Sequence, residues 1–242
     1  MYKIFHILRR ESPETESYWE DFPYDTSEEA ATVATALAEM NRNRQGGNKS
    51  FRLIAWDHSC LQKKCGACAM VIDGIPRLAC KTRLIECGDT IRLEPLKKFP
   101  VVEDLLVDRS LMMENLKDLS VWFEDQAGPA GMGGEEMAYE ASRCLQCGLC
   151  LEVCPNFYGG GSFAGMAGMA PLARLLARLP ENQRKKLAGD YKKGVYEGCG
   201  KSLACRDICP AGIDLERLLV RSNAAAIWKR WNVVNKRWDV VN

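Results

Sequence analysis

Residues 144–155 read Cys144-Leu145-Gln146-Cys147-Gly148-Leu149-Cys150-Leu151-Glu152-Val153-Cys154-Pro155. The four cysteines are spaced C-x2-C-x2-C-x3-C and a proline follows the last one, a ligand pattern of bacterial proteins that hold [4Fe–4S] clusters. In that pattern the fourth cysteine ligates the other cluster of a pair. The stretch therefore predicts two clusters and a second set of cysteines that completes them.

A second cysteine group lies further along the chain, with the spacing C-x5-C-x3-C and a proline after its last cysteine. If the two groups cross as in the paired pattern, one [4Fe–4S] cluster is held by Cys144, Cys147, Cys150 and Cys209. The other cluster is then held by Cys154, Cys199 and Cys205.

This second group lacks one cysteine of the full run, because position 202 is a serine. A serine hydroxyl is hard to ionise and is a poor ligand in a soft metal site. We therefore expect a [3Fe–4S] cluster at the three remaining cysteines. The alternative is a four-iron cluster completed by Ser202, a hydroxide or an unrelated ligand.

A third group precedes these two and has the spacing C-x4-C-x2-C, with a fourth cysteine after an eleven-residue gap. This is the plant-type ligand set for a [2Fe–2S] cluster, and its members are Cys60, Cys65, Cys68 and Cys80. Gly66 lets the backbone pass close to the cluster. The alternative is a zinc ribbon, for which we expect two C-x2-C pairs instead. Cys87 is left over and is interpreted as a small buried hydrophobic residue.

Twelve cysteines in 242 residues indicate either disulfides or metal. Residues 1–15 lack the apolar region and cleavage site of a secretory signal, so we expect reduced thiols and prefer metal. His6 and His58 are the only histidines, so the ligands are nearly all thiolate. The net charge of +1 gives no basic field for nucleic acid, and 47% hydrophobic residues exclude a disordered chain.

A membrane span is not predicted. Residues 155–173 carry no charge, but five glycines and two prolines interrupt the run, which is not the predominantly apolar segment that a bilayer requires. We expect a peripheral protein without a transmembrane segment of its own.

The residue pattern predicts an α+β first part and a mostly helical second part. Strands are expected at 2–8, 51–56, 69–72 and 90–95, with a turn at Asp73-Gly74 and a helix between 27 and 40, capped by Thr26 or Ser27. Helices are expected at 102–107, 111–116, 172–179 and 214–231, with a loop at 126–134. The glycine-rich run 159–170 is interpreted as a close-packed loop near the clusters. The predicted domains are 1–104 and 105–242.

With these three cysteine groups in this order, the chain resembles the iron–sulfur subunits of the succinate dehydrogenase/fumarate reductase family (respiratory complex II). The resemblance rests on residues 59–80, on residues 95–108 and on the two cysteine–proline groups. It implies a fold with an α+β N-terminal β-grasp domain (plant-type [2Fe–2S] ferredoxin), followed by an all-α C-terminal domain (bacterial-ferredoxin-like, α-helical).

The same resemblance implies a role in electron transfer within the respiratory chain and the tricarboxylic acid cycle. Single electrons pass between the flavin of an FAD-containing, dicarboxylate-binding flavoprotein subunit and quinone or menaquinone at a membrane-anchor cytochrome b. The path is [2Fe–2S], [4Fe–4S] and [3Fe–4S], at the cytoplasmic face of the cell membrane. The chain itself carries no dicarboxylate site and no catalytic residue, because it has neither a Rossmann fingerprint nor an acid/base constellation.

The chain departs from the family near the quinone end, where many members have a serine and two tryptophans after the proline. Here Pro155 is followed by Asn156, Phe157, Tyr158 and Gly159. Family members often have a histidine directly after the first cysteine of the last group. In this chain that position is occupied by Gly200. The quinone pocket is therefore altered or lies wholly on the anchor subunit, and the candidate quinone vicinity on this chain is Pro155, Asn156 and Tyr158. We hypothesise that Asn156 and Tyr158 only line the approach to the last cluster.

The tryptophans and basic residues of 223–242 indicate docking onto the membrane anchor or, equally, packing onto the protein's own helices.

Two competing functions are considered. One is the electron-transfer subunit of a soluble flavoprotein reductase with a non-quinone donor, whose relatives carry a further cysteine-rich region. Residues 210–242 contain no cysteine, which disfavours this function. The other is an assembly or nucleic-acid protein with structural clusters, which the near-zero net charge and three unlike clusters disfavour.

Overall fold

The computed structural model describes residues 1–45, 52–122, 134–179 and 181–228. The chain divides into two compact units, Met1–Arg109 and Ser110–Asn242, which are described separately. The predicted domain boundary between residues 104 and 105 stays a prediction.

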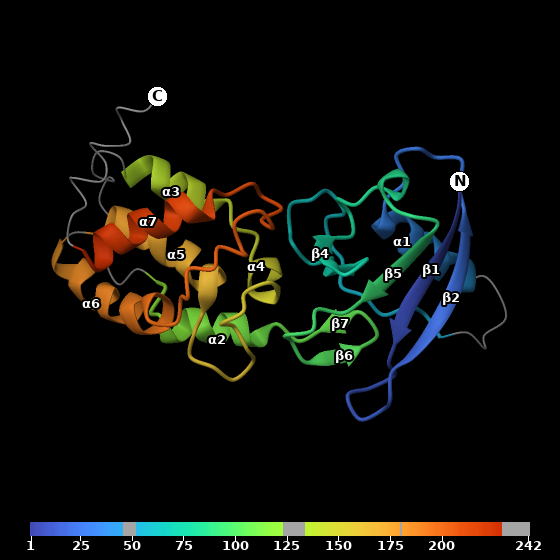
Figure 1. Ribbon diagram of the computed structural model, residues 1–242, viewed down its shortest axis with the longest axis horizontal. Helices are drawn as coiled ribbons and strands as arrows, with labels where there is room; N and C mark the ends of the chain where they lie inside the picture. The colour runs from blue at the N-terminus through green and yellow to red at the C-terminus, as the bar shows by residue number, and fades with distance from the viewer. Residues whose placement is uncertain (46–51, 123–133, 180, 229–242) are drawn as a thin grey trace. The chain divides into compact units, whose positions relative to one another are not determined.

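A five-stranded mixed sheet forms the first unit, in the order β2-β1-β5-β3-β4 (Figure 1). The strands are β1 Tyr2–Arg9, β2 Tyr18–Asp25, β3 Ala69–Ile72, β4 Ile75–Leu78 and β5 Thr90–Glu94. β1 pairs antiparallel with β2, Phe5 opposite Phe22, and parallel with β5, His6 opposite Arg92. The unit also holds helix α1 (Val33–Gln45), a 3₁₀ turn (Leu84–Glu86) and the hairpin of β6 (Val101–Glu103) and β7 (Leu106–Val107).

The core of this unit lies on one face of the sheet. Phe5 and Ile7 of β1 are completely buried, and Phe22 and Tyr24 of β2 are buried beside them. The rings of Phe5 and Tyr24 meet edge-to-face with centroids 5.9 Å apart. Tyr24 donates from its hydroxyl to Glu39 of α1 at 2.6 Å, so this helix covers the buried face of the sheet.

The predicted strands at 2–8, 69–72 and 90–95 are confirmed by β1, β3 and β5, and the turn at Asp73-Gly74 joins β3 to β4. The predicted helix near 27–40 is real but begins later. The hydroxyl of Thr32 accepts from the backbone N–H of Thr35 at 3.1 Å, so Thr32 takes the capping role predicted for Thr26 or Ser27.

Residues 52–56 form no strand, so the prediction of a strand at 51–56 is wrong for the described part of that segment. Most of the backbone hydrogen bonds of this segment go to side chains, and the carbonyl of Ala55 accepts from the N–H of Leu105 in the β6–β7 turn. Ile54 exchanges two hydrogen bonds of 2.8 Å with the Asn41 amide, and the carbonyl of Leu53 accepts from Arg9 at 2.9 Å. Because these groups are already satisfied, the segment does not pair in a sheet.

Residues 102–107, predicted to be helical, instead form the β6–β7 hairpin around Asp104. Asp104 has a left-handed backbone (φ +44°) and a side chain with no exposed surface. Its carboxylate lies 3.0 Å from Arg9 Nε and 2.5 Å from Arg52 Nη2, and it accepts from the N–H groups of Arg10 and Ala55, both at 2.9 Å. These buried ionic contacts stabilise the turn at Asp104. The spacing of apolar residues, on which the helix prediction rested, contains no signal for them.

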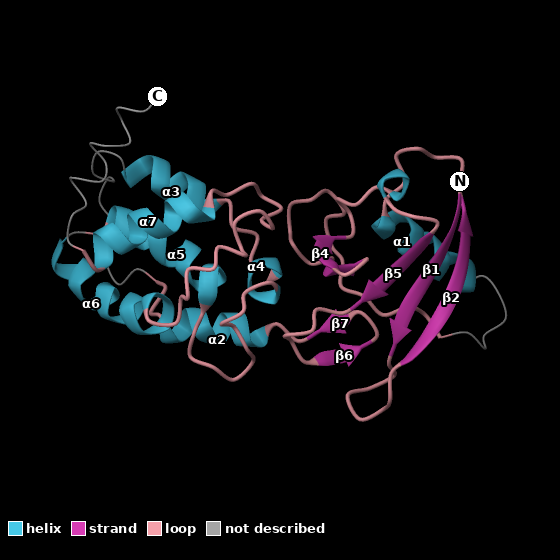
Figure 2. Cartoon of the chain, in the orientation of Figure 1, coloured by secondary structure: helices cyan, strands magenta, loops and turns pink. Residues whose placement is uncertain are grey.

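The described residues of the second unit form helices joined by loops and include no strand (Figure 2). Its helices are α2 Ser110–Asp118, α3 Gly134–Ser142, α4 Leu149–Glu152, α5 Gly165–Arg178, α6 Glu181–Tyr191 and α7 Leu215–Ala226, with a π-helical turn at Lys192–Tyr196. Helix α5 is central, because most of its residues are buried and it packs against α2, α3, α4, α6 and α7. The helices predicted at 111–116 and 172–179 lie largely within α2 and α5, and the start of 214–231 lies in α7.

The glycine-rich run 159–170 is close-packed only in its second part, because Gly159 and Gly160 are exposed, and residues 165–170 belong to helix α5 rather than to a loop. A Cβ at Gly168 would lie 2.5 Å from Ala164 Cβ and 2.8 Å from Leu119 Cδ1. A Cβ at Gly194 would lie 2.4 Å from Leu119 Cδ2. The two glycines therefore let the Leu119 side chain pack against both backbones.

Some predictions fall outside the described residues: the loop at 126–134, apart from Gly134, and residues 229–242 with Trp231 and Trp238. Trp228, the last described residue, is partly exposed. No described helix has the length and apolar content that crossing a membrane requires.

Candidate metal centres

The three cysteine groups share a backbone feature. Each contains two left-handed residues spaced two apart: Leu61 and Lys63 (φ +52° and +64°), Gln146 and Gly148 (+50° and +85°), and Lys201 and Leu203 (both +56°). Leucine, lysine and glutamine rarely adopt this conformation, and such residues concentrate at functional sites. Alternating left-handed residues curl the backbone so that N–H groups converge on an anion, here the cysteine sulfurs.

At the first centre, backbone N–H groups point at the sulfurs. Cys60 Sγ accepts from the N–H of Gln62 at 3.3 Å and of Lys64 at 3.4 Å, and Cys80 Sγ accepts from Lys63 at 3.3 Å. The Sγ atoms of Cys68 and Cys80 lie 3.3 Å apart. Cys68 and Cys80 are buried at the ends of the β3–β4 hairpin, whereas Cys60 and Cys65 are partly exposed.

The cysteine thiols of this centre differ in pKa between its exposed side and its buried side. The backbone hydrogen bonds from Gln62 and Lys64 lower the pKa of the Cys60 thiol to about 7. Burial raises the pKa of the Cys68 thiol to about 12. Cys60 is therefore ready to act as a thiolate near neutral pH, whereas Cys68 needs a bound cation to stabilise its ionised form.

Arg109 supports the loop of the first centre and was missed in the sequence, where it belongs to no motif. Its guanidinium donates to Ala67 O at 2.8 Å, to Gly66 O at 3.1 Å and to the Asp57 carboxylate at 2.6 Å. These bonds hold the turn between Cys65 and Cys68 against the body of the first unit.

The second centre is a small cavity in the second unit that brings together Cys144, Cys147, Cys150 and Cys209. Its other walls are mostly apolar and include Met166, Ile213 and Leu215. Burial raises the pKa of Cys147 to about 11 and that of Cys150 well above its usual range. As at Cys68, ionisation of these thiols requires a cation in the cavity.

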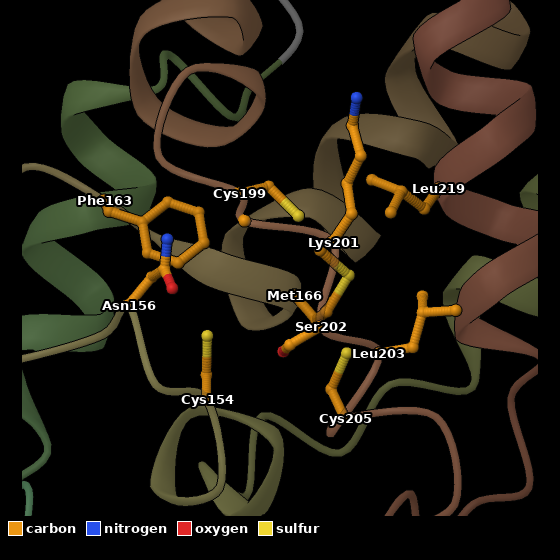
Figure 3. Close-up of a pocket in the computed structure, with 11 residues that line it drawn as sticks. Cys154, Asn156, Phe163, Met166, Cys199, Lys201, Ser202, Leu203, Cys205 and Leu219 are labelled. Carbon is orange, nitrogen blue, oxygen red and sulfur yellow. The ribbon is translucent and has the colours of Figure 1, made fainter.

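Cys154, Cys199 and Cys205 line a neighbouring cavity, the third centre, and Figure 3 shows their sulfurs around one space. The Ser202 side chain lies on the same space, and its Oγ accepts from the N–H of Ala204 at 3.5 Å. Burial, followed by the charge of Cys154, raises the pKa of Cys205 to about 11.

The donors in these centres fit iron–sulfur clusters. Among the described residues, no three His, Cys, Asp or Glu side chains converge closely enough to bind a single metal ion. Four cysteines line one cavity of the second unit and three line the other. This arrangement suits a cluster, whose irons are ligated at separate corners, better than zinc, whose ligands meet at one atom.

Known proteins show the same two parts. A family model described as "2Fe-2S iron-sulfur cluster binding domain" matches residues 4–114, and one described as "4Fe-4S dicluster domain" matches residues 140–213. The succinate dehydrogenase iron–sulfur subunit of Bacillus subtilis is 37% identical over 233 residues, 90% of each chain. The chain belongs to the family of succinate dehydrogenase and fumarate reductase iron–sulfur subunits.

Other relatives agree with this membership. The fumarate reductase iron–sulfur subunit of Escherichia coli O6:H1 is 29% identical over 203 residues, which are 80% of this chain and 79% of that one. A chain of the Mycobacterium smegmatis Sdh1 complex has the same fold with a TM-score of 0.69 at 20% identity, and the match covers 92% of this chain and 95% of that one. The protein is thus an oxidoreductase subunit with a [2Fe–2S] and a [4Fe–4S] binding domain.

The residues assigned to the quinone vicinity of this iron–sulfur subunit are not all brought together. Asn156 lines the third centre and donates from Nδ2 to Gly198 O at 2.8 Å. Pro155 and Tyr158 are exposed and do not belong to the described lining of that cavity. A Cβ at position 200 would lie 2.9 Å from Asn156 Nδ2, so Gly200 leaves the room that the Asn156 side chain occupies.

Cys87 lies outside the described lining of these centres. It is half-buried rather than fully buried, and its thiol donates to Arg83 O at 3.4 Å. Burial raises the pKa of this thiol. Cys87 is therefore less buried than predicted, and its lack of a ligand role stays a prediction.

Proposed function

We propose that this subunit carries single electrons between the FAD of a dicarboxylate-binding flavoprotein subunit and quinone or menaquinone at a membrane-anchor cytochrome b. The observation that carries the proposal is Met166, which lines both the second and the third centre. If both cavities hold clusters, the two clusters share one lining side chain, which supports electron transfer between them.

The ligand sets are part of the proposal. Cys60, Cys65, Cys68 and Cys80 would hold [2Fe–2S]; Cys144, Cys147, Cys150 and Cys209 would hold [4Fe–4S]; Cys154, Cys199 and Cys205 would hold [3Fe–4S]. When bound, each cluster supplies a site that gains and loses one electron. The three-iron form at the third centre is supported by Ser202, since the lining has a hydroxyl where the full run has a thiol.

The protein's own residues prepare these sites for added charge. Backbone N–H groups at the first centre donate to sulfur, which stabilises negative charge there. Phe163, Met166 and Leu219 supply the apolar part of the lining at the third centre. Burial and hydrogen bonding together set how readily each site accepts an electron.

The fold names and location also belong to the proposal. The strand order β2-β1-β5-β3-β4, with α1 between β2 and β3, supports a β-grasp ferredoxin domain, and the helices around the second and third centres support an α-helical ferredoxin domain. The subunit would lie peripherally on the cytoplasmic face of the membrane. The domains 1–104 and 105–242 stay predictions.

At the quinone end, Asn156 and Tyr158 would only line the approach to the last cluster. The Asn156 amide is already engaged with Gly198 O, which supports a structural role for it. A Tyr158→Phe variant is expected to reduce quinone normally. If it lost quinone reduction with its clusters intact, this part of the proposal would be wrong.

The test is to tag the chain, extract native membranes with mild detergent and identify what co-purifies. A flavin-bearing subunit together with a hydrophobic cytochrome supports the proposal. A flavoprotein in the soluble fraction, without a membrane partner, would instead support a soluble reductase with a non-quinone donor.

A further inference from the structure

The Gln146 side chain lies inside the loop of the second centre and contacts one of its sulfurs. Its Nε2 lies 3.2 Å from Cys144 Sγ and 2.9 Å from Ala167 O, a backbone carbonyl of helix α5. The left-handed backbone at position 146 (φ +50°) turns the side chain back toward the preceding cysteine.

The chemistry of the two partners determines which way the amide points. A cysteine sulfur and a backbone carbonyl are both acceptors, and the amide nitrogen carries two N–H groups, one for each. The reverse orientation would place the amide oxygen against a carbonyl oxygen and a sulfur that is negatively charged when it binds iron. Gln146 is therefore a donor to Cys144.

The other end of the same amide carries a cost in stability. Gln146 Oε1 is buried and has no hydrogen-bond partner among the described residues. An unpaired buried carbonyl is destabilising, and such groups in native proteins often mark functional sites. Methionine has a similar length and would fill the space without this penalty, so the donor nitrogen is what distinguishes Gln146 from an apolar residue at this position.

We propose that Gln146 tunes the second centre by donating a hydrogen bond to the Cys144 ligand and so raising the reduction potential of the cluster held there. The reduced cluster carries one more negative charge than the oxidised cluster, so a donor to ligand sulfur stabilises the reduced form more. Gln146 is a positioning residue that acts through Cys144. The proposal rests on the function above, which assigns Cys144 to a [4Fe–4S] cluster.

Redox titration of the purified complex, followed by EPR, tests this role. The Gln146→Met variant removes the donor and keeps the length of the side chain. We expect full iron content, a lower midpoint potential of the four-iron centre, and unchanged potentials of the other two centres. The Gln146→Glu variant places a carboxylate near the sulfur and is expected to lower the potential further than methionine does.

Asn43→Leu is the control. This variant also removes a side-chain amide, but Asn43 is exposed on helix α1 and belongs to neither described cavity lining. We expect this variant to leave all three potentials unchanged.

Three results would overturn the proposal. They are an unchanged four-iron potential in Gln146→Met, an equal shift of all three centres, and loss of the cluster in both Gln146 variants, which would make the residue structural. Failure of the underlying function is seen separately, because the unmodified complex would then show no four-iron centre at all.

Discussion

At the scale of single residues, Ser202 is expected to decide which kind of cluster the third centre holds. Ser202 lies on the cavity with Cys154, Cys199 and Cys205, where the full ligand run would place a fourth cysteine. We expect Ser202→Cys to retain one more iron than the unmodified protein and to lose the EPR signal of the oxidised three-iron centre. The Ser202→Ala control is expected to keep that signal, and an unchanged spectrum in Ser202→Cys would contradict the assignment.

Asp104 is the residue on which the end of the first unit depends. Its buried carboxylate faces the guanidinium groups of Arg9 and Arg52. Removing one partner of a buried ion pair typically costs about 3–5 kcal/mol. Because Arg9 and Arg52 keep Glu20 and Glu103 as partners, the lower end, about 3 kcal/mol, applies here. We expect Asp104→Asn to lower the free energy of unfolding by roughly that amount, measured by denaturant titration.

The control for Asp104 is Glu86→Gln, which breaks a pair with Arg83 in which both side chains are about half exposed. Surface pairs contribute little because water screens them. A similar destabilisation in both variants would show that burial of Asp104 is not the cause.

At the scale of elements, the packing of α5 against Leu119 depends on the absence of a side chain at Gly168. We expect Gly168→Ala to destabilise the second unit by about 1–3 kcal/mol, since overpacking forces side chains and backbone to shift. The matched control is Gly189→Ala in α6, where a Cβ would meet nothing within 4 Å. That variant is expected to be neutral or to stabilise by up to about 1 kcal/mol, because alanine favours helix. The measurement is thermal unfolding of both variants, compared with that of the unmodified protein.

The guanidinium group of Arg109 holds the loop of the first centre against the rest of the first unit. A lysine has a single ammonium group and cannot reproduce the bonds to Gly66 O, Ala67 O and Asp57. We expect Arg109→Lys to release the iron of the [2Fe–2S] centre several-fold faster in the presence of a chelator, while the other centres are unaffected. Equal release from Arg109→Lys and from the surface control Arg83→Lys would argue against this support.

At the scale of the whole molecule, the cysteines are predicted to divide into eleven ligands and one residue without a ligand role. The intact protein should then contain about nine iron atoms in three clusters. We expect Cys87→Ala to keep this content, whereas Cys65→Ala, Cys147→Ala and Cys199→Ala each lower it. Iron analysis of anaerobically purified protein is the measurement, and loss of iron from Cys87→Ala would show that the division is wrong.

The order of the two parts of the chain follows from the sequence alone. Cysteine spacing is a local property, because a short loop that wraps a cluster requires its ligands at set intervals. The three cysteine groups, and with them the family, could therefore be predicted from the sequence. Strands β1, β3 and β5 were readable for a similar reason, since their apolar and β-branched runs are also local.

Only the tertiary structure decided the features that join distant residues. The β6–β7 hairpin and the unpaired segment 52–56 depend on Asp104, Asn41 and Arg9, whose partners lie far away in the sequence. No rule of residue spacing predicts the hydrogen bond from Gln146 to Cys144 or the bonds of Arg109 to the loop of the first centre. The spacing of cluster ligands is determined within one loop. Buried polar groups instead need hydrogen-bond partners that can come from any part of the chain, so their partners are known only once the fold is known.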